Sequence, residues 1–455
     1  MQQKILLPLL APLVAGCAQK AHAAEKQDPS RPNILLIVAD DVSYYDLGCY
    51  GATNNATPNI DRLAREGMQF TSAFNSSSMS TPTRHSLYTG MYPMKNGGYA
   101  NHSAVREDVL TMPVYMRQLG YRCGLAGKWH IRPEYIFSFE SVPGFKKNCL
   151  NPDPSYTLDG VREFINRSEE QPFCLVLASI NAHLPWTGGD PSVFDRAALK
   201  LPPQMMDTPE TRDIYARYLA EVTLLDQEVG DMIRLLEERG IYDNTLIIFI
   251  SEQGTEIAGA KWTNWQAGVK SGMLAKWGGH IAPGSKTDAV VQYEDILPTL
   301  IDVAGGKRPK DMDGYSIRKV LDGKTDKHRK YAFSQTCMVP EGPSYPIRSA
   351  SDGKYKLIHN LNYTHPYAVK HIENKEWFDT WRKKSEADPV SHHIWERYKN
   401  RPEYELYDIE ADPFEMTNLY GQEQYAKVAE KLKKQLVKWM TEQKDQGLAS
   451  DKELE

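Results

Sequence analysis

Three continuous apolar runs stand out along the chain, at residues 34–39, 173–179 and 246–250. Runs of this length without polar alternation are typical of strands buried on both faces of a parallel sheet. Helical spacing lies between them, beginning at residues 59–66, which follow the helix-start pair Thr57 and Pro58. The pattern therefore predicts an α/β fold with helices on both faces of a sheet.

The most regular helical pattern lies at residues 215–236. Its apolar residues recur in steps of three and four: Tyr215, Tyr218, Leu219, Val222, Leu225, Val229, Met232, Ile233 and Leu236. This spacing places them on one face of a helix, and Gly240 is a typical residue to end it. We expect one long helix with a single buried face.

The pattern changes after about residue 330. Short strand-like pieces at residues 331–333, 355–359 and 404–407 are separated by turns, and a long polar helix at about 423–443 follows. These features predict a smaller antiparallel sheet with one packed helix. We therefore divide the chain into a large α/β domain at residues 30–330 and a C-terminal subdomain at 331–455.

Composition narrows the class of protein. The chain has 455 residues, of which 41% are apolar and 25% charged, as in ordinary globular proteins. Its net charge of −5 argues against a nucleic-acid-binding protein, which usually carries a basic stripe. Six cysteines occur without a CxxC spacing, which indicates neither a zinc site nor a disulfide framework.

The first 23 residues are typical of an export signal. Lys4 precedes an apolar stretch at residues 5–14 that is too short to span a bilayer. Residues 14–17 then resemble a bacterial lipobox, which would make a lipidated Cys17 the mature N-terminus. Ordinary cleavage after the small-residue site at 21–23 is the alternative. We expect an exported protein, periplasmic or anchored at the cell surface.

Two predicted strands end in acidic or amide side chains. Asp40 and Asp41 follow the first strand, and Glu252 and Gln253 follow the strand at 246–250. Ligands of open α/β sheets bind beyond the carboxyl ends of the strands. Carboxylate and amide oxygens suit calcium or magnesium rather than zinc. For either segment alone, an ordinary turn or helix cap is the simpler interpretation.

The segment from Ser80 to Gly90 carries the most specific motif. Its sequence, STPTRHSLYTG, resembles the C/S-x-P-x-R-x-x-L-x-T-G signature of the type I sulfatases. In that family the first residue is oxidised to formylglycine, the catalytic nucleophile. The resemblance implies that Ser80 is the modified residue and that Arg84 holds it. A plain serine-rich loop is the alternative, because residues 76–78 are also serines.

The resemblance extends over nearly the whole mature chain. Segments matching the family lie at residues 31–41, 127–130, 181–186, 261–268 and 295–300. They imply an alkaline-phosphatase-like fold and one calcium ion bound by Asp40, Asp41, Ser80, Glu252 and Gln253. They also imply that Lys128, Lys261 and His183 surround the sulfate. His183 or Lys261 would protonate the leaving group, and His130 would accept a proton when sulfate is released.

Two departures from the family pattern bear on function. The family usually has Asp-Asn or Asp-His where this chain has Glu252 and Gln253, so the metal site must accommodate a longer carboxylate. The modified position is Ser80 rather than the commoner cysteine. Activity therefore requires a maturation enzyme that accepts serine.

The C-terminal part indicates the substrate. Residues 344–349, 356–362 and 404–408 resemble the N-sulfoglucosamine sulfohydrolases. This resemblance implies a sulfated carbohydrate containing glucosamine, with sulfate on nitrogen or oxygen. We expect Arg348 to bind the sugar, because an arginine fork can hold an anionic group or several hydroxyls. His102, in a polar loop after the signature, is the second predicted sugar ligand.

Two other functions are compatible with the sequence. A phosphodiesterase or phosphonate hydrolase of the alkaline-phosphatase superfamily would share the fold. A second, histidine-rich metal site would favour phosphate, and we find no such cluster in the sequence. Alternatively, an unmodified Ser80 would leave a protein that binds sulfated glycans without hydrolysing them. The mass of the Ser80 peptide distinguishes a modified residue from serine.

Overall fold

A computed structural model describes residues 31–149 and 155–452 of the chain. The predicted export signal, including Cys17, therefore lies outside the described residues. The main sheet has eight strands in the order β5-β4-β6-β1-β7-β8-β2-β9. Its strands are β1 Asn33–Ala39, β2 Met68–Phe70, β4 Arg122–Gly127, β5 Glu140–Val142, β6 Phe173–Ala178, β7 Thr245–Ser251, β8 Met273–Lys276 and β9 Ser285–Thr287. A short pair joins β3 Ala73–Phe74 to β10 Val291–Gln292.

The central strands are buried on both faces, as their apolar sequences predict. Every residue of β1, β6 and β7 is buried. Alternate side chains of β1 enter different cores: Leu35 and Ile37 pack with one set of helices, and Leu36 and Val38 with the other. Antiparallel β8 makes the sheet mixed, because its neighbours β7 and β2 run opposite to it.

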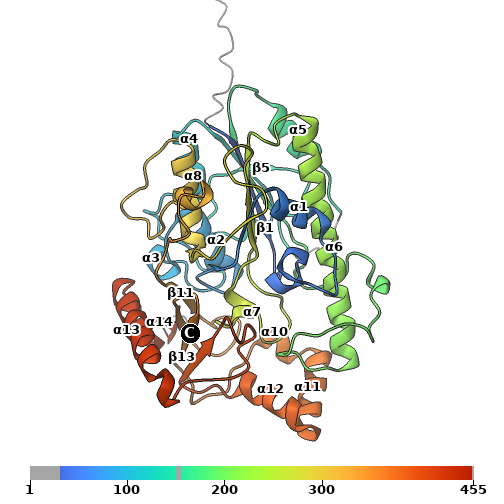
Figure 1. Cartoon of the computed structure of the whole chain (residues 1–455), viewed down its shortest axis with the longest axis vertical. Helices are drawn as coiled ribbons and strands as arrows, with labels where there is room; N and C mark the ends of the chain where they lie inside the picture. The colour runs from blue at the N-terminus through green and yellow to red at the C-terminus, as the bar shows by residue number, and fades with distance from the viewer. Residues whose placement is uncertain (1–30, 150–154, 453–455) are drawn as a thin grey trace, which may run out of the picture.

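Helices cover both faces of this sheet (Figure 1). On one face lie α1 Pro58–Glu66, α5 Asp159–Asn166 and α6 Pro209–Glu238. On the other lie α2 Ser80–Thr89, α4 Met112–Gln118 and α8 Ile296–Val303. The α/β architecture predicted from the alternating strands and helices is confirmed. No helix in the described parts of the chain has the length and apolar character needed to cross a membrane.

Helix α6 shows how local sequence sets its limits. The Thr208 side chain accepts a hydrogen bond from the Thr211 N–H and so caps the first turn. At the other end Gly240 adopts φ +65°, and its N–H donates to the Glu237 carbonyl at 2.9 Å. A residue with a side chain is strained in this left-handed conformation, so glycine suits the position. The predicted helix and its glycine end are confirmed.

The parallel central strands bring their carboxyl ends to one edge of the sheet. Strands β4, β6, β1 and β7 are neighbours in that order and run parallel. Cα pairing sets Ala39 of β1 opposite Ser251 of β7. The segments that follow these strands therefore meet at the same edge, where the sequence has its acidic and basic side chains.

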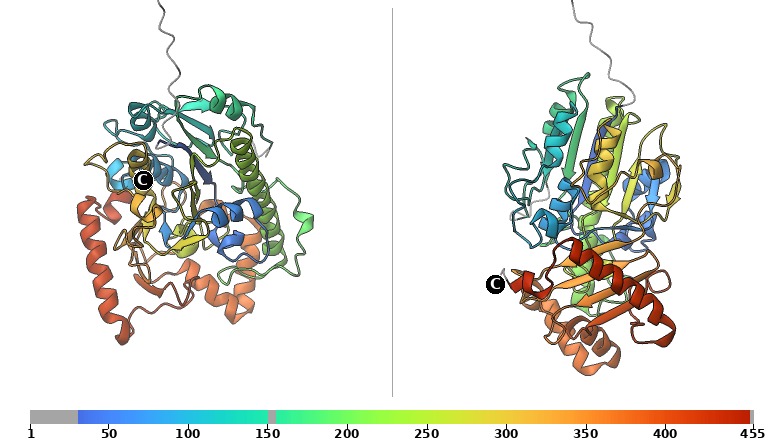
Figure 2. Two further views of the ribbon diagram at one scale, coloured as in Figure 1. Left: turned by 45° about the horizontal axis from the view of Figure 1, so that its top comes forward. Right: turned by 90° about the vertical axis from the view of Figure 1, so that its left-hand side faces the viewer.

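A second sheet follows in the chain and lies at one end of the main sheet (Figure 2). Its antiparallel order is β11-β12-β13-β14, with bounds Ala332–Thr336, Ile347–Ser351, Tyr355–Asn360 and Tyr404–Asp408. Helix α13, Ala426–Glu442, packs on it through Leu432 and Leu436. The small antiparallel sheet with a packed helix is therefore confirmed.

Strand β12 and four helices of this region, α10, α11, α12 and α14, have no counterpart among the sequence expectations. Strand β12 has the sequence IRSAS, which contains neither an apolar run nor a strict alternation of apolar and polar residues. Helices α11, Glu376–Ala387, and α12, Pro389–Lys399, form a pair beside the small sheet (Figure 1). The remaining short helices are α3 Pro93–Asn96, α7 Gln266–Val269, α9 Arg318–Leu321, α10 Lys370–Glu373 and α14 Leu448–Lys452.

The packing of α13 on the small sheet generates a stability prediction. Leu432 is fully buried in this contact, whereas Val437 on the same helix is 56% exposed. Leu432→Ala should lower the free energy of unfolding by about 2–5 kcal/mol, because it removes buried methyl groups and leaves a cavity. Val437→Ala should change it by less than about 0.5 kcal/mol. Chemical denaturation followed by tryptophan fluorescence measures both, and equal effects would contradict the packing.

Candidate active site

The signature segment forms the buried helix α2, with Ser80 as its first residue. All residues of α2 are buried. Pro82 lies in the first turn, where backbone N–H groups have no acceptor within the helix. Proline has no N–H, so its presence there removes no helical hydrogen bond. The first helical hydrogen bond runs from the Thr83 N–H to the Met79 carbonyl at 3.0 Å. Gly90 ends the helix in the left-handed conformation, with φ +68°.

Three carboxylates meet in front of Ser80. Asp40 and Asp41 follow β1, Glu252 follows β7, and all three are fully buried. Their oxygens lie within 4.8 Å of one another. Asp41 has φ +53°, so the chain turns sharply just after the strand. This turn allows two consecutive carboxylates to converge, although consecutive residues within a strand face opposite sides.

The Ser80 hydroxyl lies at the centre of this group. Its Oγ donates to Oε2 of Glu252 at 3.1 Å and accepts from Nε2 of Gln253 at 3.1 Å. Nζ of Lys128 lies 3.3 Å away. The hydroxyl is therefore held between acidic residues and a buried ammonium group.

Buried cations pair with the three carboxylates. Lys128 Nζ lies 2.5 Å from Asp40 Oδ2, Lys261 Nζ lies 2.7 Å from Asp41 Oδ2, and Arg84 Nε lies 2.6 Å from Glu252 Oε1. Although burial opposes ionisation of Asp40, Lys128 holds its pKa well below the usual range. Burial raises the pKa of Glu252 to about 8, and Arg84 only partly offsets this. Additional positive charge would therefore stabilise the ionised cluster.

Lys128 reaches this position from the end of β4. Gly127 precedes it with φ +97°, and a Cβ at Gly127 would lie 2.0 Å from the Ala178 carbonyl oxygen. Only glycine permits this close approach of β4 to β6. The glycine of the GKWH segment thus has a steric role.

The histidines occupy two sides of the site. His183 Nε2 lies 3.1 Å from Glu256 Oε1 and 3.6 Å from Asp41 Oδ2. Burial lowers the pKa of His183 to about 4, opposed by Glu256. His130 Nε2 lies 2.9 Å from Nδ1 of His102. Burial, with the nearby Lys128 and Arg84, also lowers the pKa of His130.

Ser80, the two lysines and the histidines line one cavity of about 490 Å³. It contains Ser80 and five other residues proposed from the sequence: His102, Lys128, His130, His183 and Lys261. Sequence reasoning missed further lining residues, namely Asn101, Arg132, Lys147, Cys149, Glu256, Trp262, Glu341 and His371. Glu256 has a local signal, since it lies in the same acidic loop as Glu252. Glu341 and His371 come from the C-terminal part of the chain and have none.

Arg348 does not reach this cavity, so the expectation that it binds the sugar is wrong. Its guanidinium is fully buried in β12, with Nε 2.5 Å and Nη2 3.0 Å from the Asp445 carboxylate. Nη1 donates to the carbonyls of Thr336 and Ile347. The N–H groups of the Arg348 guanidinium are therefore hydrogen-bonded within the protein and do not face a substrate.

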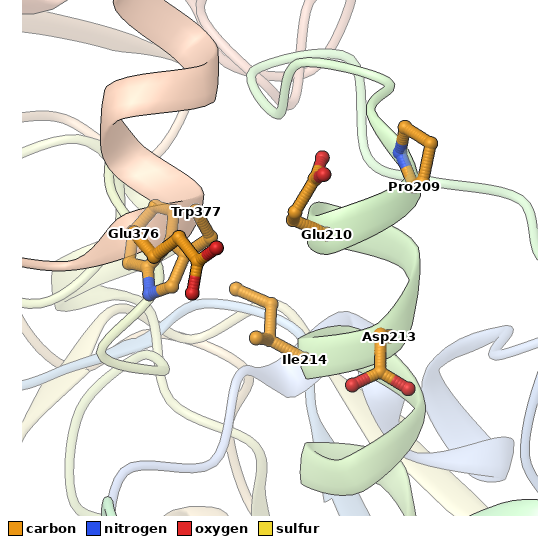
Figure 3. A pocket seen from close by; sticks show the side chains of 6 residues that line it. All are labelled: Pro209, Glu210, Asp213, Ile214, Glu376 and Trp377. Carbon is orange, nitrogen blue, oxygen red and sulfur yellow. The ribbon is translucent and has the colours of Figure 1, made fainter.

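Another surface pocket lies between α6 and α11 (Figure 3). It presents the carboxylates of Glu210, Asp213 and Glu376 beside Ile214 and Trp377. It lacks a cation and a nucleophile, so it does not suit an anionic substrate. The Ser80 cavity is the candidate active site.

Fold and site together define a class of protein. A hydroxyl held among buried carboxylates, two lysines and an arginine, at the carboxyl edge of an α/β sheet, is the site of a hydrolase for oxyanion esters. The sulfatase family model matches residues 32–306. The chain belongs to the sulfatase family, whose members hydrolyse sulfate esters or sulfamates. The model for the C-terminal region of N-sulphoglucosamine sulphohydrolase also matches, at residues 261–397 and 391–442.

Curated relatives extend over nearly the whole chain. An ulvan-active sulfatase of Formosa agariphila is 31% identical, covering 97% of this chain and 88% of that protein. Human N-sulphoglucosamine sulphohydrolase is 27% identical over 91% of each chain. An N-acetylglucosamine-6-O-sulfatase of Bacteroides thetaiotaomicron is 24% identical, covering 97% of this chain and 91% of that protein.

Solved structures confirm the fold. A protein in complex with its substrate D-glucosamine-2-N,6-O-disulfate matches with a TM-score of 0.70 and 21% identity, covering 91% of this chain and 99% of that chain. A phosphonate monoester hydrolase from Silicibacter pomeroyi matches with a TM-score of 0.69 and 19% identity, covering 91% and 96%. The same fold therefore occurs in proteins with sulfur-containing and with phosphorus-containing substrates. The substrate of this protein has to be inferred from its active-site residues.

The buried pair of Arg348 and Asp445 generates the second prediction. Arg348→Ala should lower the free energy of unfolding by about 3–5 kcal/mol, because it leaves Asp445 buried without its partner. Chemical denaturation measures the loss. The double variant Arg348→Leu/Asp445→Leu should recover part of it. A stable Arg348→Ala protein with a raised KM would instead restore the sugar-binding role.

Proposed function

We propose that this protein removes sulfate from glucosamine-containing glycans, after oxidation of Ser80 to formylglycine. The observation that carries the proposal is the position of the Ser80 hydroxyl, which lies between Lys128 and the carboxylate cluster and lines the cavity. A sulfate bound there would meet Lys128 and Lys261, which stabilise negative charge as it develops in the transition state.

The residues around Ser80 fit a calcium ion. Asp40, Asp41 and Glu252 offer oxygens within 4.8 Å of one another. Oε1 of Gln253 is a buried acceptor without a hydrogen-bond partner among the described residues. An oxygen-only donor set suits a hard cation. We propose that these four residues and residue 80 hold calcium, which would supply charge neutralisation to the nucleophile and the sulfate.

Formylglycine would supply a hydrated aldehyde at residue 80, whose two hydroxyls allow attack on sulfur and later release of sulfate. Serine has one hydroxyl and no such release step. The proposal therefore includes a maturation enzyme that accepts serine. Arg84, buried and paired with Glu252 at 2.6 Å, would hold the first turn of α2 during both steps.

Protonation of the leaving group is assigned to His183 or Lys261. Both line the cavity, and both lie within 3.1 Å of the same oxygen, Oε1 of Glu256. This shared carboxylate keeps the two donors together on one side of the site. The departing amine or alcohol would take its proton there.

The substrate class rests on the C-terminal match and on the relatives. Human N-sulphoglucosamine sulphohydrolase and the bacterial N-acetylglucosamine-6-O-sulfatase both carry glucosamine in their names. Arg132 and Lys147 line the cavity as well, and they add positive charge that favours a polyanionic glycan. We also propose export of the protein, on the basis of residues 1–23, with Cys17 as lipid anchor.

Phosphonate or phosphodiester hydrolysis is the second candidate function, favoured by the structural match to a phosphonate monoester hydrolase. Each metal-binding group formed by the described residues contains at most one histidine. This arrangement supports a single hard cation rather than an additional histidine-rich site. Sulfate is therefore the preferred substrate.

The third prediction tests modification and substrate together. Coexpression with a serine-type maturation enzyme should yield a Ser80 peptide lighter by two hydrogen atoms, measured by mass spectrometry. The matured protein should release sulfate from N-sulfoglucosamine or N-acetylglucosamine-6-sulfate far faster than it cleaves a phenyl phosphonate ester. Ser80→Ala should abolish turnover.

Three outcomes would contradict the proposal. Faster cleavage of the phosphonate ester would favour the second candidate. A matured Ser80 peptide without any sulfate release from either sugar would exclude the glucosamine substrates. An unchanged peptide mass, combined with binding of sulfated glycans and no turnover, would support a binding protein instead.

The fourth prediction concerns the metal. Calcium should raise the melting temperature of the purified protein, and elemental analysis should find about one calcium per chain. Asp40→Asn should remove both effects, since it takes away one charged ligand. Asp243→Asn, at an 86% exposed side chain on the surface, is the control and should retain them. Zinc without calcium in the active protein would contradict the assignment.

A further inference from the structure

One wall of the cavity carries a carboxylate that the proposed chemistry does not use. Glu341 lies between β11 and β12, its side chain is only 6% exposed, and it lines the same cavity as Ser80. Of the described residues that line this cavity, only Glu256 is also acidic, and its Oε1 is paired with Lys261 Nζ at 2.8 Å. A carboxylate on the wall of a pocket for an anion weakens binding of that anion by repulsion. Its presence indicates that a part of the substrate other than the sulfate contacts it.

Glu341 is an ionised acceptor that can take further hydrogen bonds. Asn101 Nδ2 donates to its Oε1 at 2.5 Å, and His102 Nε2 lies 3.4 Å from the same oxygen. Although burial opposes ionisation, His102 and Asn101 lower the pKa of Glu341 to about 2. The other oxygen, Oε2, lies 3.3 Å from Nε2 of His371, whose side chain is 65% exposed. Exposed side chains change rotamer quickly, so a donor on a ligand can take the place of His371 at Oε2.

An aromatic side chain lies on the same wall. Trp262 lines the cavity, and its ring centroid lies 6.3 Å from that of His371. Its indole Nε1–H is buried and has no hydrogen-bond partner among the described residues. Lys261 Nζ lies 4.9 Å from the centroid of the Trp262 ring, so this wall adjoins a lysine of the proposed sulfate site. An aromatic side chain beside a few polar groups is typical of a small-molecule binding site.

The chain holds Trp262 in an uncommon backbone conformation. Its φ is +65°, a value that residues with side chains rarely adopt. The Trp262 N–H donates to the Ser78 carbonyl at 3.0 Å, and the Trp262 carbonyl accepts from the Tyr367 hydroxyl at 2.9 Å. Strained conformations persist where the surroundings hold them, and they cluster at functional sites. The segment before Ser80 and the C-terminal subdomain therefore fix this wall together.

We propose that Glu341 is a specificity-determining residue, which accepts a hydrogen bond from a ring hydroxyl of the sulfated sugar while Trp262 packs against that sugar. This inference rests on the proposed function and deepens it, because it names what is recognised on the substrate besides the sulfate. The C-terminal subdomain thus contributes to substrate choice through Glu341 and His371, and Arg348 has no part in it.

The charge of Glu341 also determines which sugars this wall refuses. A hydroxyl donates a hydrogen bond to a carboxylate, whereas a second sulfate at the same position cannot donate and is repelled. Discrimination of this kind combines a favourable contact with a repulsive one. Anionic groups at other positions of the glycan can still be bound by Arg132 and Lys147, which line the cavity. A sugar with a second sulfate facing Glu341 must therefore lose that sulfate to another hydrolase first.

The fifth prediction compares two substrates of the matured enzyme. Glu341→Gln keeps the shape of the side chain and removes its charge. It should lower kcat/KM for the better of the two glucosamine sulfates by about 10- to 100-fold, as for loss of a hydrogen bond to a charged acceptor. It should change kcat/KM for a small aryl sulfate, which has no ring hydroxyl, by less than about twofold. Glu403→Gln is the matched control, because Glu403 lies 3.6 Å from His359 outside the cavity, and it should leave both values unchanged. Equal losses of Glu341→Gln on both substrates would overturn the proposal.

Substrates that lack one ring hydroxyl identify the position that Glu341 contacts. The wild type should cleave either the 3-deoxy or the 4-deoxy analogue about 10- to 100-fold more slowly than the parent sugar. Glu341→Gln should cleave that analogue nearly as fast as the wild type does, because the two changes remove the same interaction and their effects are not additive. The sugar sulfated at this hydroxyl should be cleaved faster by Glu341→Gln than by the wild type. Additive losses for both analogues would contradict the contact.

Binding to the unmatured protein separates failure of this inference from failure of the proposed function. Without formylglycine the sugar sulfate can be titrated by calorimetry with no turnover, and Glu341→Gln should raise its Kd about 10- to 100-fold. Melting temperatures verify that both proteins are folded. The expected rise in Kd, in a protein that releases no sulfate after maturation, would overturn the proposed function alone. Equal Kd values, with sulfate released from the sugar at the wild-type rate by Glu341→Gln, would overturn the role of Glu341 alone.

Discussion

The buried carboxylates at the ends of β1 and β7 are the constraint on which the site depends. Asp40, Asp41 and Glu252 are fully buried within 4.8 Å of one another, so they repel and have lost most of their hydration. Such a cluster persists only when cations are held against it. Helix α2 supplies Arg84, the end of β4 supplies Lys128, and the loop after β7 supplies Lys261. The same helix places Ser80 among them.

Two C-terminal residues with ionised side chains show how differently a buried charge can be used. The Arg348 guanidinium donates hydrogen bonds to Asp445 and to backbone carbonyls, and so it joins β12 to the segment after α13. Glu341 instead lines the cavity, where its Oε1 lies 3.4 Å from His102 Nε2. Both are buried and both are paired, yet only one contacts the site. Burial and pairing by themselves therefore do not identify a functional residue.

The fold alone does not determine the reaction. A protein solved with its substrate D-glucosamine-2-N,6-O-disulfate and a phosphonate monoester hydrolase share this architecture, at TM-scores of 0.70 and 0.69. The reaction has to be argued from the groups at one edge of the sheet. These are a cluster of buried carboxylates, a hydroxyl in the signature sequence, and lysines that follow two different strands. Chemistry of this kind depends on side chains that the sheet holds in place and not on the sheet itself.

The sequence by itself determined the central strands and helix α6, because apolar periodicity and a glycine at the helix end are local properties. It also indicated Asp40, Asp41, Glu252 and Gln253 as neighbours, since the ends of neighbouring parallel strands must meet, whereas Ser80 and Lys128 came from the resemblance to the sulfatase family. Only the tertiary structure decided the position of Arg348, the existence of β12, and the contact from Glu341 to His102. These depend on pairings between residues far apart in the chain, 97 positions for Arg348 and Asp445, and no local pattern encodes such pairings.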